Sequence, residues 1–173
     1  MSGDKEARVR RWTLAGAAIL LIAASPQWGR AQVQVDGRAG IGAAFGGSSN
    51  TDLSGLFALG VGAGRFHVRL DVLANGGGYA EEWAANVALQ VDVLRGPVRK
   101  PTLYLLAGLG AVSASSIFAS DEYAVLVTGA GLQLPLTSAF GLFGELRGYF
   151  ALNPPPEASS FGTVHAGIRV GAP

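Results

Sequence analysis

The sequence predicts an all-β fold: an eight-stranded antiparallel up-and-down transmembrane β-barrel, preceded by a cleaved signal peptide. In residues 66–74, FHVRLDVLA, apolar side chains occupy every second position and alternate with His67, Arg69 and Asp71. A period of two is that of a β-strand whose faces meet different environments. The pattern recurs over roughly ten residues each time, the length that a tilted strand needs to cross a bilayer. No apolar run reaches about 18 residues, so a helical membrane protein is not predicted.

Composition supports one barrel domain. The chain has 173 residues, of which 49% are hydrophobic and 14% charged. The 26 glycines suit strands that bend or leave room inside a narrow barrel. Cysteine is absent from the sequence, which excludes disulfides, thiol catalysis, a lipid-modified N-terminal cysteine and cysteine-ligated zinc.

Residues 1–31 have the organisation of an export signal. A basic segment ending at Arg10 and Arg11 precedes an apolar core over 14–24, LAGAAILLIAA, which is too short to span a bilayer as a helix. Gly29 and Ala31 place small residues before a cleavage site. We therefore expect a mature chain that begins at Gln32 and a barrel over 32–173. The alternative is an N-terminal anchor helix that stays attached.

The alternation predicts eight strands in order. The first, third, fourth and seventh alternate clearly, with groups such as Asp36, Asp92 and Glu145 opposite an apolar face. The second, fifth and sixth alternate less clearly, because both of their faces carry small or apolar residues. The predicted strands are 33–45, 55–63, 66–75, 83–94, 102–112, 124–134, 140–150 and 162–171.

The connections between these strands are of two predicted kinds. Longer polar loops, GGSSNTDL, NGGGYAEE, SASSIFASDE and ALNPPPEASS, alternate with mostly shorter connections, GR, RGPVRKP and PLTSA. Long loops on one side and short periplasmic turns on the other are typical of outer-membrane barrels. An even number of strands places both chain ends in the periplasm.

Aromatic residues at the ends of the outward faces predict two girdles. Phe45, Trp83 and Phe150 are expected near the outer interface, and Phe66 and Phe140 near the inner one. The alternative is that they are core residues of a soluble sandwich, because alternation alone does not say which face is wet.

The segments YLLAGLGA (104–111) and GAGLQLPLTSAFGLFGELRGYF (129–150), the latter with inward Glu145 and Arg147, carry a family resemblance. The chain resembles the small eight-stranded outer-membrane barrels of the OmpA/OmpX-like, porin-like class from about Gln32 onwards. This resemblance implies a monomer in the outer membrane of a Gram-negative cell, in contact with lipid and lipopolysaccharide and inserted by the outer-membrane assembly machinery. Members usually end in an aromatic residue that this machinery reads, whereas this sequence ends in Pro173.

Charged and titratable residues at inward positions predict a polar network in the lumen. An eight-stranded barrel is just wide enough for side chains to fill, which favours a polar plug over a wetted channel. Because an isolated buried charge is costly, Arg169 is expected to pair with Asp36 or Glu145. The predicted network consists of Asp36, Arg38, His67, Arg69, Asp71, Asp92, Glu145, Arg147, His165 and Arg169.

The motifs predict no catalytic, cofactor or metal site. Residues 32–173 hold eight basic and ten acidic residues, and no basic patch suggests nucleic-acid binding. Thr163 and Gly167 stand where a serine of a strand-borne Ser-His-acid set would be expected beside His165. We therefore expect a structural or surface-interaction barrel rather than an enzyme. The alternatives are a narrow pore for ions or small solutes, a lipid-modifying envelope enzyme, and a soluble exported barrel that carries an apolar ligand.

Overall fold

Eight strands contain nearly all of the residues that the computed structural model describes, which are 33–46, 51–77, 80–95, 100–116, 120–152 and 160–172. The predicted signal peptide, 1–31, lies outside them. Within these ranges, no helix is long and apolar enough to cross a membrane. The strands are β1 (Val33–Gly46), β2 (Asp52–Ala63), β3 (Phe66–Gly77), β4 (Ala80–Arg95), β5 (Thr102–Ser116), β6 (Ser120–Pro135), β7 (Phe140–Leu152) and β8 (Phe161–Ala172).

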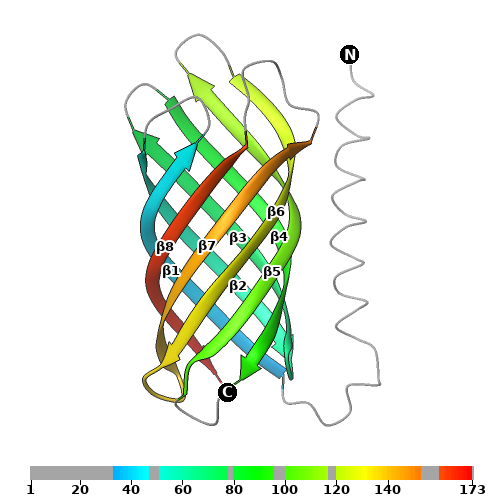
Figure 1. Ribbon diagram of the computed structural model, residues 1–173, viewed down its shortest axis with the longest axis vertical. Coiled ribbons are helices and arrows are strands. Elements are labelled where there is room, and N and C mark those ends of the chain that lie inside the picture. Colours follow the sequence, from blue (N-terminus) through cyan, green and yellow to red (C-terminus); the bar gives the residue numbers. More distant parts are fainter. Residues whose placement is uncertain are drawn as a thin grey trace. The chain divides into compact units, whose positions relative to one another are not determined.

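The strands form a closed antiparallel barrel in sequence order, with β1 paired to β8 (Figure 1). The predicted fold class is confirmed. We call the end of the barrel where β1 begins and β8 ends the turn end, and the opposite end the loop end. At the turn end β2 and β3 are joined by a two-residue turn, in which Gly64 has a φ of 63°. That left-handed conformation favours glycine.

The pairing register fixes the tilt of the strands. Starting at Asp36 of β1, we follow the paired residue from each strand to the next around the barrel. The path arrives back on β1 at Gly46, ten residues further along the strand. With eight strands, this shift gives a tilt of roughly 40° to the barrel axis. The interior is then narrow enough to be filled by side chains.

The predicted limits of two loops are wrong, because the strands beside them are longer than expected. Residues 75–82 and 113–122 were expected to be loops, but β3 and β4 extend to Gly77 and Ala80, and β5 and β6 extend to Ser116 and Ser120. Pairing with the neighbouring strand reaches Gly77 and Ala80 in the first segment and Ser115 and Ser120 in the second, because the ladder outweighs local composition. The acidic residues of these segments, including Glu82 and Glu122, therefore belong to strands.

Alternation places the apolar face outside. Most large apolar residues of the outer wall, such as Leu70, Val87 and Leu146, expose between 37% and 74% of their surface. The side chains between them in sequence are buried in the lumen, charged ones such as Arg69 and Asp71 included. This distribution is the reverse of that in a soluble protein.

Candidate functional site

The lumen contains all ten residues of the predicted polar network. Nine of them are buried, and the side chain of the tenth, Arg169, is 19% exposed at the turn end. Alternation puts these side chains on the inner face, and curvature of the closed sheet brings opposite strands within reach. The four arginines of the network balance its four carboxylates.

The carboxylate of Glu145 on β7 accepts hydrogen bonds from three side chains. Its Oε2 accepts hydrogen bonds from Arg69 Nη1 at 2.7 Å and from the Tyr104 hydroxyl at 2.6 Å. Its Oε1 accepts one from Arg147 Nε. Because β3 and β7 lie on opposite walls, the contact between Arg69 and Glu145 crosses the lumen.

Asp71 on β3 completes this cluster. Its Oδ1 lies 3.1 Å from Arg69 Nη2, and its Oδ2 lies 3.0 Å from Arg147 Nη1. Arg69 and Arg147 thus share Asp71 and Glu145. Two buried arginines held between two carboxylates form a neutral unit, which lowers the cost of burying each charge.

A second cluster lies nearer the turn end. Asp36 Oδ2 accepts hydrogen bonds from Arg38 Nε at 2.8 Å and from Arg169 Nε at 3.2 Å. Of the two partners predicted for Arg169, Asp36 is therefore the one contacted. Arg38 Nη2 donates to Gln90 Oε1 at 2.9 Å, and Gln90 Nε2 donates to Asp92 Oδ1 at 3.0 Å. Asp92 Oδ2 also lies 3.6 Å from His67 Nε2.

Sequence reasoning missed the contributions of Gln90 and Tyr104. Gln90 accepts from Arg38 and Arg69 and so links the two clusters. The Tyr104 ring lies under the guanidinium groups of Arg38 and Arg69, whose Cζ atoms are 5.2 and 6.0 Å from the ring centroid. An inward glutamine was recognisable from alternation in β4, but an inward tyrosine in an otherwise apolar β5 was not.

Inward glycines make room for these large side chains. A Cβ at Gly131 on β6 would collide with the Tyr104 ring, and one at Gly62 on β2 would collide with the His67 ring. Glycines on one strand therefore accommodate the large side chains of their register partners on the neighbouring strand.

The loop-end half of the lumen contains an apolar zone that the sequence did not predict. The rings of Tyr149 and Phe161 stack with centroids 4.6 Å apart. Arg147 Nη1 donates to the Tyr149 hydroxyl at 3.3 Å, which joins this zone to the ion network. The zone consists of Leu56, Leu73, Val112, Tyr123, Val125, Val127, Tyr149 and Phe161, all buried and in one cluster. The weak alternation of β2, β5 and β6 reflects these inward apolar residues.

A buried serine–histidine contact also lies in the lumen. Ser54 Oγ is 2.8 Å from His165 Nε2 and donates to Asn75 Oδ1 at 2.7 Å. Nucleophile and base meet in this way in hydrolases. Here the third group is an amide, and Ser54 is only 1% exposed. Among the residues described, no group of His, Cys, Asp and Glu is arranged to hold a metal ion.

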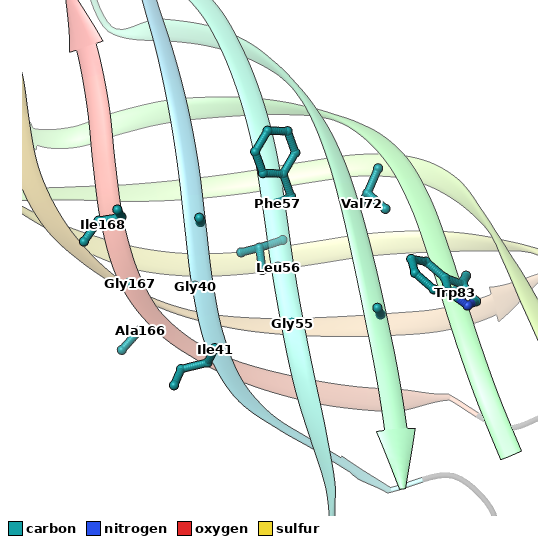
Figure 2. A pocket seen from close by; sticks show the side chains of 12 residues that line it. Gly40, Ile41, Gly55, Leu56, Phe57, Val72, Trp83, Ala166, Gly167 and Ile168 are labelled. Carbon is teal, nitrogen blue, oxygen red and sulfur yellow. The ribbon is translucent and has the colours of Figure 1, made fainter. Parts of the chain in front are cut away.

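The outer wall carries an apolar depression of about 500 Å³ that crosses β8, β1, β2, β3 and β4 (Figure 2). It follows one row of paired residues, in which three members, Ala166, Gly55 and Ala74, have small side chains or none. Larger residues such as Phe57 and Trp83 border it. Its lining offers almost no polar group, so we take the lumen as the candidate site.

The five predicted girdle residues all lie on the outer wall, with exposures of 38–54%. Phe45, Trp83 and Phe150 lie in the loop-end portions of β1, β4 and β7. Phe66 and Phe140 are the first residues of β3 and β7, at the turn end. These five residues thus lie toward the two ends of the apolar wall, whereas Phe57, which is also exposed, lies in the middle of β2.

Comparison with known proteins identifies the fold. No family model and no curated protein sequence matches the chain. Among solved structures, the N-terminal β-barrel domain of Pseudomonas aeruginosa OprF superimposes with a TM-score of 0.68 at 15% identity, covering 82% of this chain and 99% of that one. Neisserial surface protein A (NspA) gives a TM-score of 0.63 at 16% identity over 80% and 96%.

The attachment invasion locus protein Ail of Yersinia pestis gives a TM-score of 0.53 at 14% identity, over 82% of this chain and 98% of that one. All three align over nearly their whole length with a barrel that accounts for most of this chain. The chain therefore has the fold of the small eight-stranded outer-membrane β-barrels, as the sequence predicted.

Proposed function

We propose that this protein is an integral outer-membrane β-barrel with a structural or surface-interaction role and a closed lumen. The observation that carries the proposal is the inverted distribution of side chains: buried charges inside and exposed large apolar residues outside. An outer wall of this kind is stable only where hydrocarbon covers it. The aromatic residues at the two ends of the wall then lie at the two membrane interfaces.

Both halves of the lumen support closure. In the turn-end half, each arginine of the network contacts a carboxylate across or along the barrel. In the loop-end half, buried rings and aliphatic side chains fill the apolar zone, and its polar groups are the hydroxyls of Tyr123 and Tyr149. Two hydroxyls are too few to replace the hydration shell of an ion. To pass through the barrel, an ion would have to disrupt the ion network in one half of the lumen and cross the apolar zone in the other. These features favour a plug over the alternative of a narrow pore.

The remaining alternatives fit the geometry less well. A soluble carrier of an apolar ligand needs an apolar cavity inside, whereas this interior is filled with ion pairs and packed rings. A lipid-modifying enzyme needs a nucleophile that reaches its substrate. Ser54 is buried, so we assign its contact with His165 a structural role.

Detergent gels and planar bilayers test this proposal together. We expect the folded protein to partition into detergent, to migrate faster before boiling than after, and to give little or no current. Steady, large single-channel steps would establish a pore. A mature protein that stays in buffer without detergent would exclude a membrane barrel altogether.

A further inference from the structure

Half of the unpartnered polar atoms in the described lumen belong to residues around the ion pair between Arg147 and Asp71. Ten buried side-chain atoms lack a hydrogen-bond partner in the described part of the chain. Five of them, on four residues, are both amide atoms of Asn86, Thr163 Oγ1, His165 Nδ1 and Arg147 Nη2. The four residues are each 2% exposed or less. Unpaired polar atoms at such depth are rare in folded proteins, because each costs the desolvation of its group.

The ion pair between Arg147 and Asp71 brings these atoms together. Thr163 is the register partner of Arg147, and Asn86 is the register partner of Asp71. Since the guanidinium and the carboxylate meet at 3.0 Å, their neighbours on β8 and β4 both lie beside the same bridge across the lumen. His165 follows Thr163 on the same inner face of β8.

Neighbouring positions at this level carry no side chain. Gly110 on β5 is the register partner of Asn86, and Gly42 on β1 is that of His165. The inner wall is therefore flat beside two of the unpartnered groups.

The hydrogen-bonding requirements of these atoms identify the ligand. Ser54 has one hydroxyl proton and gives it to Asn75, so His165 Nε2 is the donor to Ser54. In a neutral imidazole the other nitrogen, Nδ1, is then an acceptor and needs a donor. Arg147 Nη2 needs an acceptor, and the side-chain amide of Asn86 needs both a donor and an acceptor.

Water satisfies this mixed set, because it donates and accepts and is small enough for a packed lumen. A cation would be repelled by Arg147, and an anion would be repelled by Asp71 and Glu145. We propose that ordered, long-lived water molecules bind between Asn86 on β4 and Thr163 and His165 on β8, and complete the hydrogen bonds around the Arg147–Asp71 pair. This inference concerns the interior alone and does not depend on where the barrel resides.

Relaxation dispersion of water oxygen-17 in the folded, detergent-solubilised barrel tests the proposal. We expect wild type to show a slowly exchanging water component, which Thr163→Val reduces. The matched control, Thr128→Val, changes a threonine on an outward position of β6 and should leave the component unchanged. A wild-type barrel without this component, or one whose component survives Thr163→Val, would overturn the proposal. The wild-type measurement stands even if the variant does not fold.

The direction in which the urea unfolding midpoint changes is an independent test. If water bridges the groups, Thr163→Val and Asn86→Leu each lower the unfolding midpoint. The double variant lowers it by less than the two shifts together, because both substitutions remove water from around the same Arg147–Asp71 pair. If the groups are truly unpaired, the apolar substitutions raise the midpoint, which would refute bound water. An open, conducting lumen would be recognised separately by its current, so failure of closure and failure of this inference are distinguishable.

Discussion

Replacing Glu145 with alanine tests whether the ion network stabilises the barrel. The substitution removes the acceptor for Arg69, Arg147 and the Tyr104 hydroxyl. Breaking a fully buried ion pair typically costs about 3–5 kcal/mol. Both arginines keep Asp71 at 3.0–3.1 Å, so we expect the lower end, about 3 kcal/mol. With typical urea dependences of about 1–3 kcal/mol per molar, the unfolding midpoint should fall by roughly 1–3 M.

The assay is equilibrium urea unfolding in detergent or lipid vesicles, followed by the fluorescence of Trp83. Lys100→Ala is the control, because it removes an exposed charged side chain outside the strands and should shift stability by no more than about 0.5 kcal/mol. Equal shifts for the two variants would refute the argument that the Glu145 contacts hold the barrel together. The current through the Glu145→Ala barrel should stay low, since the apolar zone remains.

Three further predictions concern the two faces of the wall. Val87→Arg on the outer face should destabilise the barrel in lipid by about 2–4 kcal/mol, measured by urea unfolding in vesicles, and a cost near zero would mean that this face does not meet hydrocarbon. Trp83, which is 54% exposed, should be quenched by brominated acyl chains more strongly than by aqueous acrylamide, and the opposite order would remove it from the lipid face. Gly131→Ala should lower the unfolding midpoint because its Cβ meets the Tyr104 ring, whereas Gly76→Ala, which has open space around it, should not; equal midpoints would show that the lumen relaxes freely.

The facing of the charged residues was predictable from sequence because it depends on local periodicity. Asp36, Arg69 and Glu145 each stand in a strand with an unambiguous apolar face, so their inward position follows from a period of two. Closure followed from the prediction that the strands cross a membrane, because hydrocarbon cannot solvate the open edges of a sheet. The limits of β3 to β6 were not predictable from composition, because pairing with a neighbour carries glycine- and serine-rich segments into the ladder.

The partners inside the lumen could not be derived in the same way. Glu145 meets Arg69 from the opposite wall only because the register shifts by ten residues around the barrel, a property of all eight strands together. Tyr104 and Ser54 stand in strands with apolar or small residues on both faces, so nothing local distinguished them. Their roles emerge from three-dimensional proximity.

The pairing of β1 with β8 has a consequence for the order of assembly. Val35 pairs with Ala172, so this seam joins residues 137 positions apart, whereas every other pair of strands is a local hairpin. Such distant contacts form late, because the entropy of closing the long loop is lost before any of them stabilises the chain. Until the seam forms, β1 and β8 each present unpaired backbone amides and carbonyls, which hydrocarbon cannot solvate. Closing the seam and entering the lipid are therefore coupled events, and a chain arrested before closure would expose both edges to pairing with other chains.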